Sequence, residues 1–404
     1  MLSFLLRDEF LTRERVRLWS LGMLLTAVVV VVGLFATSHG LNDLKGRPIG
    51  TDFSDVYAAG QLARDGAPEK AYDPAVHYRQ EQAIFGQDTP FYGWHYPPFF
   101  LVLASALSAL PYLVALGLWQ LLTFAAYFLA MRALLRNGPS PEAVRDPVWL
   151  LVAVGFPAVL VNLLHGQNGF LTTALLAGGL ALLDRRPIVA GVLLGLMAYK
   201  PQFGVLIPLA LAAGGKWRTF GAATATVLGL IALATLSFGV EIWPAFLASG
   251  HFSRTVVLEA GGTGFEKIQS VFSAVRFIGG PVGLAYGAQA FAAVAVAALI
   301  IYLWRSSANS AVKGAALCLG TLFATPYSLD YDLMLLAPAI ALLASDGRAR
   351  GFRKGELLLL SGLWILPAGA RALASGTHIV IAPVLIAMAL VFAWRRADSR
   401  FERF

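Results

Sequence analysis

The sequence has little charge and almost no cysteine, and each deficit excludes a class of protein. Only 13% of its 404 residues are charged, about half the 25% usual in a soluble globular protein. The single cysteine, Cys318, excludes an intramolecular disulfide scaffold and a thiolate metal cluster. Apolar residues make up 58% of the chain and its mean hydropathy is +0.69, which excludes disorder. No soluble core could hide so much apolar surface, so the composition predicts a polytopic membrane protein.

Apolar segments recur along the whole chain. A membrane-spanning helix needs about 20 residues. Segments that reach or approach this length lie at about 18–36, 97–131, 147–164, 169–183, 187–215, 219–240, 282–304, 314–325, 331–345, 357–370 and 378–394. The segment 187–215 is broken near Pro201 and predicts a hairpin of two short helices, whereas 97–131 fits one long span or a re-entrant pair. We predict an all-α polytopic membrane protein, one integral domain over residues 1–404, with about 11–13 transmembrane helices.

The distribution of Lys and Arg predicts the orientation. With the N-terminus in the cytoplasm, most of the 31 basic residues fall on the inner side, as the positive-inside rule requires. The net charge of +8 therefore needs no nucleic-acid partner. The segment 18–36 has no clean cleavage site after it and predicts a retained span rather than a signal peptide. We expect a multi-pass protein of a bacterial inner membrane, with both termini cytoplasmic.

This orientation places two long polar stretches on the extracytoplasmic side. The first outer loop covers about 37–96, and the second covers about 241–281. Within the first loop, Ser54–Arg64 and Ala75–Phe85 predict short interfacial helices. Two short connections, at 165–168 and 325–332, face the same side. Polar residues therefore gather at one membrane boundary.

The residues at this boundary suit one kind of chemistry. The sequence has no Gly-rich phosphate loop, HExxH pair or GxSxG elbow. It offers carboxylates, cations and other polar groups, namely Asp52, Asp55, Lys200, Arg254, Arg276, His165, Gln167, Asn168, Tyr327 and Asp332. Transfer of a group from a lipid phosphate to a hydroxyl needs a base for the hydroxyl and cations for the departing phosphate. The pattern is compatible with such a transfer.

Each candidate also has a purely structural explanation. Asp52 follows Thr51 and precedes a helical pattern, which is typical of an N-cap, and Asp55 suits the first turn of a helix. Lys200 beside a helix break fits a snorkelling lysine. Loop charges explain Arg254 and Arg276, an interfacial histidine explains His165, and an aromatic belt explains Trp94-His95-Tyr96.

Several short motifs are spread over about residues 51–345 in a fixed order: Thr51-Asp52-Phe53, Tyr57-Ala58-Ala59-Gly60, Gly66, Ala71-Tyr72-Asp73-Pro74, Tyr96-Pro97-Pro98, Gly166-Gln167-Asn168, Gly195-Leu196, Lys200-Pro201-Gln202, Gln269-Ser270-Val271, Arg276 and Tyr327-Ser328-Leu329-Asp330-Tyr331-Asp332. In order and spacing, this set of motifs resembles glycosyltransferase family 87. Members of this family are GT-C-type membrane enzymes related to the mycobacterial polyprenol-phosphate-mannose-dependent α-1,2-mannosyltransferases.

The resemblance implies a GT-C-type fold, a helical first outer loop and a mechanism. A sugar, mannose by implication, would pass with inversion from a polyprenyl-phosphate donor to a hydroxyl of a glycolipid or glycan acceptor on the extracytoplasmic face. Asp52 would be the general base, with Asp55 as its rival because the register differs by one residue. Lys200, Arg276, Arg254 and His165 would bind the donor phosphate, and Gln167, Asn168, Tyr57, Tyr327 and Asp332 would bind the sugar or acceptor. No metal or other cofactor is required, and Asp330 and Asp332 are better explained as groups that hydrogen-bond the start of the next span.

Two other classes of function remain open. A lipid-linked glycan transporter or flippase would need ionisable residues near the bilayer midplane and internal repeats. A polysaccharide polymerase or ligase would depend on arginines of the outer loops more than on an early aspartate. A structural scaffold would leave the one-sided polar residues unexplained.

Overall fold

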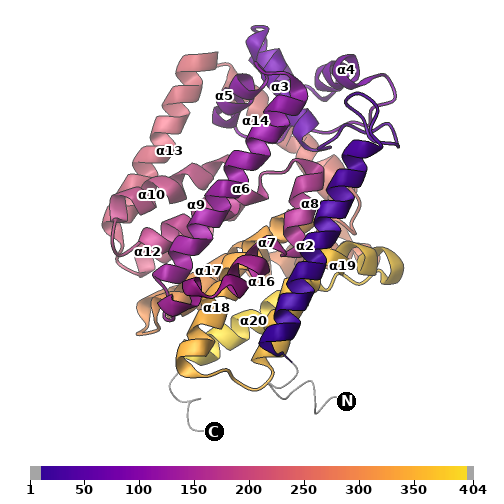
Figure 1. Cartoon of the computed structure of the whole chain (residues 1–404). Helices are drawn as coiled ribbons and strands as arrows, with labels where there is room; N and C mark the ends of the chain where they lie inside the picture. The colour runs from indigo at the N-terminus through magenta and orange to yellow at the C-terminus, as the bar shows by residue number, and fades with distance from the viewer. Residues whose placement is uncertain (1–10, 398–404) are drawn as a thin grey trace.

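The computed structural model describes residues 11–397, and these residues form helices joined by short connections (Figure 1). The first half contains α2 (Arg13–Ala36), α3 (Phe53–Arg64), η2 (Pro68–Tyr72), α4 (Pro74–Phe85), α5 (Pro98–Leu107), α6 (Tyr112–Arg136), η3 (Pro141–Arg145), α7 (Pro147–Val154), α8 (Pro157–His165), α9 (Gly169–Leu182) and α10 (Pro187–Leu196). The second half contains η4 (Met197–Tyr199), α11 (Pro201–Gly204), α12 (Leu206–Ala213), α13 (Trp217–Phe238), α14 (Ile242–Phe252), η5 (Ser253–Glu259), α15 (Val271–Phe277), α16 (Val282–Arg305), α17 (Ser310–Ala324), η6 (Asp330–Leu335), α18 (Leu336–Arg350), α19 (Glu356–Thr377) and α20 (Ala382–Ala397).

Proline and capping residues set many of the helix starts. Proline is the first residue of α4, α5, α7, α8, α10 and α11. Its fixed φ suits the first helical turn, and its missing N–H would be unpaired there in any case. Side chains of Asp73, Asp146 and Asn309 accept hydrogen bonds from the backbone at the starts of α4, α7 and α17. These local signals explain why helix starts are readable from the sequence.

The helices confirm an all-α polytopic membrane protein. Five of them, α2, α6, α13, α16 and α19, are long and apolar enough to cross a membrane, and the bent pair α7–α8 adds a sixth if it is one span. Shorter apolar helices of 10–17 residues are α5, α9, α10 with η4, α11 with α12, and α17. The prediction of about 11–13 spans included these short segments, which do not reach the length of a full crossing. By length and composition, the described residues thus hold five or six spans.

The predicted breaks and outer-loop helices agree with the structure. The segment 187–215 is divided at Lys200 into α10 with η4 on one side and α11 with α12 on the other. The segment 97–131 consists of the short α5 and the long α6, separated at Pro111. The two outer-loop helices, α3 and α4, each begin one residue before the predicted position.

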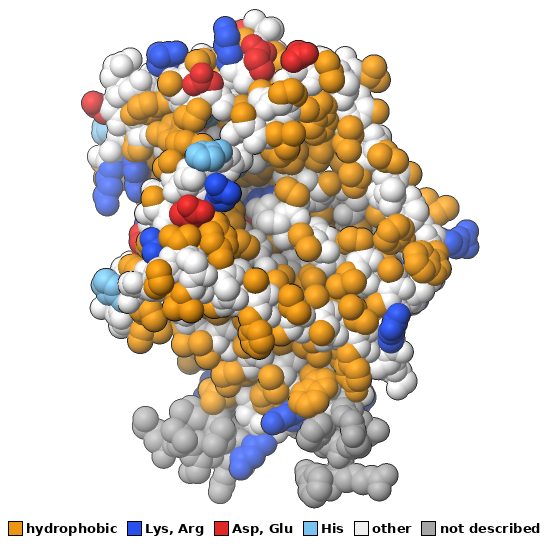
Figure 2. Space-filling view, turned by 180° about the vertical axis from the view of Figure 1, so that it is seen from behind, with side chains coloured by type: hydrophobic (Ala, Val, Ile, Leu, Met, Phe, Trp, Pro, Cys, Tyr) orange, Lys and Arg blue, Asp and Glu red, His pale blue; other side chains and the backbone are white. Residues whose placement is uncertain are grey.

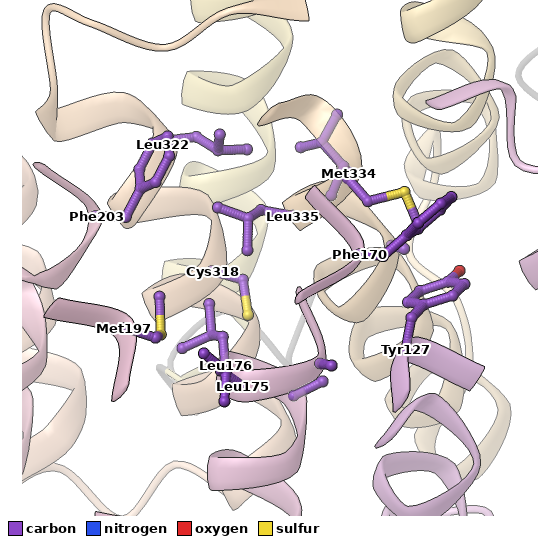
Figure 3. Close-up of a cluster of buried hydrophobic side chains, with 14 of the residues drawn as sticks. Tyr127, Phe170, Leu175, Leu176, Met197, Phe203, Cys318, Leu322, Met334 and Leu335 are labelled. Atoms are coloured by element: carbon purple, nitrogen blue, oxygen red, sulfur yellow. The ribbon is translucent and has the colours of Figure 1, made fainter. Parts of the chain in front are cut away.

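Apolar side chains form both the core and much of the surface. Tyr127, Phe170, Met197, Phe203 and Cys318 lie in the buried cluster drawn in Figure 3. On the surface, large side chains of the spanning helices are exposed, such as Leu236 at 87% and Phe291 at 77%. Figure 2 shows orange side chains over the middle of one face, with acidic side chains gathered in its upper half. Exposed apolar surface of this extent is suited to lipid.

The two ends of the molecule differ. Figure 1 shows the start of α2 and the end of α20 toward one end, while α3, α4, α5 and α14 gather at the other. Helix α3 packs closely on α5, because a Cβ atom added at Gly60 would lie 2.1 Å from the carbonyl oxygen of Ala104. Only glycine allows this approach, which explains the glycine of the Tyr57-Ala58-Ala59-Gly60 motif.

Candidate active site

A polar cavity of about 370 Å³ opens at the end of the molecule that carries α3 and α4. It is formed by residues of the first outer loop, both short outer connections, the break before α11 and the second outer loop. Its lining residues are Arg47, Asp52, Asp55, Pro90, Phe91, Tyr92, Gly93, His95, Tyr96, His165, Gln167, Tyr199, Lys200, Gln202, Gly262, Thr263, Lys267, Tyr327, Leu329, Asp330, Tyr331 and Asp332. The fold therefore gathers polar residues that lie up to about 280 positions apart in the sequence.

Asp52 is held in this cavity by the connection between α8 and α9. Its Oδ2 accepts a hydrogen bond from Gln167 Nε2 at 2.9 Å, and its Oδ1 lies 3.6 Å from His165 Nδ1. The hydroxyl of Thr51 lies 2.7 Å from the same His165 nitrogen and 3.2 Å from Asp52 Oδ1. Although Asp52 precedes α3, its side chain makes no capping hydrogen bond. The N-cap explanation of Asp52 is therefore wrong, because its carboxylate is directed to the cavity partners instead.

Gly166 makes this arrangement possible. It ends α8 with a φ of 63°, in the left-handed region that favours glycine. A Cβ atom at this position would also lie 2.6 Å from the Cβ of Phe53. The tight turn places His165 and Gln167 on either side of a residue that packs against the start of α3. The Gly-Gln-Asn motif thus positions partners for Asp52.

The environment separates the pKa values of Asp52 and Asp55. Burial raises the pKa of Asp52, but His165, Gln167 and Lys267 outweigh this effect and lower the pKa to about 2. Burial, together with the charges of Asp52 and Glu81, raises the pKa of Asp55 well above its ordinary value. The cavity therefore shifts the pKa values of its two acids in opposite directions, downward for Asp52 and upward for Asp55.

Asp55 is the less accessible of the two acids. It is 5% exposed, and its Oδ1 makes no hydrogen bond to a described residue. A buried polar atom without a partner is unusual in a folded protein and marks a place where a ligand can form the missing bond. Asp55 lines the same cavity as Asp52, so its position is compatible with a role in ligand binding.

Lys200 lines the cavity, but it already has a partner. Its Nζ lies 2.7 Å from Asp332 Oδ1, and both side chains are buried. The ammonium also lies 5.1 Å from the ring centre of Tyr331. The other oxygen of Asp332 accepts from the backbone N–H of Leu329 at 3.0 Å, as expected for a group that holds the start of the next helix. A snorkelling lysine would reach for water, whereas Lys200 is directed inward to a carboxylate.

This pair predicts a strong effect on stability. Lys200→Met should lower the free energy of unfolding by about 3–5 kcal/mol, because it leaves Asp332 buried and unpaired. The double variant Lys200→Met/Asp332→Asn should recover most of this loss, since no uncompensated charge remains. Unfolding of the purified variants in mixed micelles measures both values. If Lys200→Met were as stable as Lys200→Met/Asp332→Asn, the ion pair of Lys200 and Asp332 would not be structural. That result would favour a role of Lys200 in donor binding.

Lys267 and Arg47 are cations of the cavity that sequence reasoning missed, and Arg47 is engaged by Asp43 at 2.7 Å. Among residues 11–397 the ammonium of Lys267 makes no hydrogen bond or ion pair, although it is close enough to Asp52 to lower the pKa of that carboxyl. Its backbone is fixed, because its carbonyl accepts from the N–H of Asp330 at 2.9 Å and the neighbouring Ile268 pairs with Leu329. Its position two residues before the Gln269-Ser270-Val271 motif was the signal that could have identified it.

The two predicted arginines lie outside the cavity lining. Arg276 donates to the backbone oxygens of Gly280 and Glu259, at 2.8 and 3.0 Å, and so ties α15 to the neighbouring loop. Arg254 has a 60% exposed side chain and lies 3.6 Å from a carboxylate oxygen of Glu259. The second outer loop therefore brings Lys267 to the cavity and leaves both arginines elsewhere.

Some of the predicted sugar-binding residues line the cavity and others lie outside its lining. Gln167, Tyr327 and Asp332 line the cavity. Asn168 is buried behind it, where its side-chain amide donates to the Tyr96 hydroxyl at 2.7 Å. The hydroxyl of Tyr57 donates to the carbonyl of Leu110, so this residue links α3 to the α5–α6 connection.

Aromatic side chains form one wall of the cavity. Tyr96 and Tyr199 line it, with their ring centres 6.3 Å apart, and Phe100 stacks on Tyr199 at 4.9 Å. Trp94 is only 3% exposed. The explanation of Trp94-His95-Tyr96 as an aromatic belt at the lipid surface is therefore wrong for Trp94 and Tyr96, because both are packed inside the protein. Aromatic faces of this kind suit the apolar faces of sugar rings.

Within the described part of the chain, no three His, Cys, Asp or Glu side chains are arranged to hold a metal ion. The expectation of transfer without a metal stays a prediction.

Comparison with known proteins identifies the family. The model of glycosyltransferase family 87 matches residues 94–338, which is more than half of the chain. The match includes the cavity lining from His95 onward, whereas the lining residues from Arg47 to Gly93, with Asp52 and Asp55 among them, precede it. Neither the curated proteins nor the solved structures contain a match. The matched segment carries Lys200, Lys267 and the connections that hold Asp52. The chain belongs to glycosyltransferase family 87 and is a multi-pass membrane glycosyltransferase.

Proposed function

We propose that this enzyme transfers a sugar, mannose in our assignment, from a polyprenyl-phosphate donor to a hydroxyl of a glycolipid or glycan. The observation that carries the proposal is that a carboxylate and a cation line the same cavity. Asp52 is an ionised carboxylate with fixed partners, and Lys267 is a cation with none among the described residues. A base and an uncommitted cation are the two groups that displacement of a lipid phosphate by a hydroxyl requires.

The reaction follows from these roles. Asp52 takes the proton of the acceptor hydroxyl as its oxygen attacks the anomeric carbon. The bond between this carbon and the phosphate oxygen breaks, and the electron pair leaves with the lipid phosphate, whose growing charge Lys267 balances. A single displacement inverts the anomeric carbon, so a β-linked donor yields an α-linked product. His165 and Gln167 are positioning residues, because they hold the carboxylate of Asp52 in place.

The location of the cavity supports a lipid-linked donor. The spanning helices would place the cavity near a membrane boundary, where a phosphate can enter while its polyprenyl chain stays in lipid. With cytoplasmic termini, this boundary is the periplasmic side of a bacterial inner membrane, since the cavity lies at the end away from the start of α2 and the end of α20. We propose that the whole chain acts as one integral domain.

Asp55 has a separate role in this proposal. As a protonated acid it would donate a hydrogen bond to the bound donor or acceptor through its unpaired oxygen. Asp55→Asn should keep most of the activity, because an amide also donates. Asp55→Leu should lower kcat/KM about tenfold, the effect of one lost hydrogen bond. If Asp55→Asn abolished transfer while Asp52→Asn did not, the two acids would exchange roles. Initial rates of both variants, after a check of folding by thermal unfolding, provide the test.

The function is tested with the purified protein in nanodiscs. Synthetic polyprenyl-phosphate mannose is offered with a panel of glycolipid acceptors, and both donor consumption and product linkage are measured. Consumption with an α-linked product supports the proposal, and a retained β-configuration contradicts the single displacement. If no donor in a widened panel of sugars is consumed, while a lipid-linked glycan moves across a sealed vesicle, the protein is a transporter and the proposal fails.

A further inference from the structure

A second pocket lies between α2, α7, α18 and α19, and it shares no lining residue with the polar cavity. Its volume is about 400 Å³. It includes the first turns of α2 and α7 and the last turn of α18. Helix α2 begins toward the end of the molecule where α20 ends (Figure 1). The pocket therefore belongs to the membrane boundary opposite the proposed active site.

The walls of this pocket are apolar and aromatic. Three tryptophans line it, together with aliphatic side chains from α7, α18 and α19; the tryptophans are Trp19, Trp149 and Trp364. Trp364 is held in place, because its indole N–H donates to the carbonyl of Val152 at 3.1 Å. Trp19 is exposed, with 60% of its surface accessible. Such walls suit a hydrocarbon chain and are unsuited to a free small anion.

The pocket carries an excess of positive charge. Arg13, Arg15 and Arg348 line it, and among residues 11–397 Asp146 is the only acid in its lining. Asp146 is engaged by Arg13, whose guanidinium approaches its two oxygens at 2.8 and 3.3 Å. Arg348 makes no hydrogen bond or ion pair within residues 11–397. A pocket with apolar walls and an arginine, Arg348, without an ion pair in the described residues is complementary to an anionic phospholipid, which has apolar acyl chains and a negative phosphate.

Helix α2 has few protein contacts along its length. Only 11% of its most apolar window is buried, and its main packing partners are α7 and α8. A lipid in the pocket would touch α2 on one side and α18 and α19 on the other. It would therefore supply packing that the polypeptide does not provide, in the same way that a side chain fills a gap between helices.

We propose that this pocket binds an anionic phospholipid of the leaflet next to the start of α2. The phosphate lies beside Arg348, and one acyl chain runs against the tryptophans. The bound lipid fixes α2 to the body of the enzyme. This inference rests on the pocket alone and is independent of the sugar that the enzyme transfers.

The test measures lipid retention by the purified full-length protein. After delipidation in detergent, phosphatidylglycerol or phosphatidylcholine with identical acyl chains is added, and bound lipid is counted by native mass spectrometry. We expect more phosphatidylglycerol than phosphatidylcholine adducts, and thermal stabilisation by phosphatidylglycerol only. Arg348→Gln should weaken retention of phosphatidylglycerol about fivefold. Arg305→Gln, which removes an exposed arginine outside the pocket, should leave it unchanged.

Three results would overturn the proposal. Equal retention of both lipids would show that the basic residues do not select a charged headgroup. Equal loss in Arg348→Gln and Arg305→Gln would show that the charge of the protein, and not this pocket, attracts the lipid. Inorganic phosphate is included as a third ligand, and stabilisation by phosphate alone would reduce the site to an anion site without a lipid. Transfer activity is not part of the readout, so failure of the proposed function would not affect the outcome.

Discussion

Asp52→Asn is expected to lower the rate of transfer by about 10²–10⁴-fold, the range that a general base contributes. The replacement is nearly isosteric, and its amide oxygen can still accept the hydrogen bond from Gln167. Folding and donor binding should therefore be retained, while the proton of the acceptor hydroxyl has no acceptor. The decisive measurement is kcat together with donor affinity, since the loss should be confined to kcat.

The matched control for this variant is Asp88→Asn. Asp88 is an exposed acid of the same outer loop and does not line the cavity. It should behave as the wild type in folding, donor binding and rate. Turnover by Asp52→Asn within a few-fold of this control would remove Asp52 from the role of base.

Lys267→Gln should lower kcat/KM for the polyprenyl-phosphate donor by about 10²–10³-fold, the effect of removing one group that stabilises charge in the transition state. The affinity for the acceptor should change little, because the lysine is assigned to the phosphate. The substitution removes no structural partner, since the ammonium makes no hydrogen bond or ion pair within the described residues. Titration of the donor at saturating acceptor measures the effect on the donor. Titration of the acceptor at saturating donor measures the effect on the acceptor.

Arg254→Gln is the control for Lys267→Gln, because it removes one positive charge from the same outer loop. Arg254 lies outside the cavity lining and is 60% exposed. Its loss should change the rate only slightly, through screened long-range attraction. A comparable loss in both variants would mean that the overall charge of the outer face attracts the donor. A larger loss in Arg254→Gln would return this residue to the phosphate site that the resemblance implies.

The local features of the fold could be predicted well from the sequence. The outer-loop helices and the break at Lys200 were found because proline and capping residues act on their immediate neighbours. Of the about 11–13 predicted segments, five, or six with the bent pair α7–α8, are long enough to cross a membrane, and the others are shorter apolar helices that hydropathy does not distinguish from spans. The short apolar helix α17, for example, is buried within the protein along most of its length.

The candidate site was predicted only in part. Asp52, Asp55, His165, Gln167, Lys200, Tyr327 and Asp332 do meet in one cavity. Arg276 could not be distinguished from a phosphate ligand in the sequence, because its partners are backbone carbonyls that become close only in the fold. Lys267 was overlooked for the converse reason, since nothing in its neighbourhood along the chain shows that its ammonium is left without a partner.

The sequence by itself determined that this protein resides in a membrane, that it is helical and which family it resembles. Composition and short motifs carry this information, and neither depends on contacts between distant residues. The tertiary structure alone decided which charges are available for chemistry. Lys200 is neutralised by a carboxylate 132 positions away, and Asp52 is held by a glutamine 115 positions away. Whether a charged group is free or committed depends on the atoms within a few ångströms of it, and in a folded chain most of these come from distant segments.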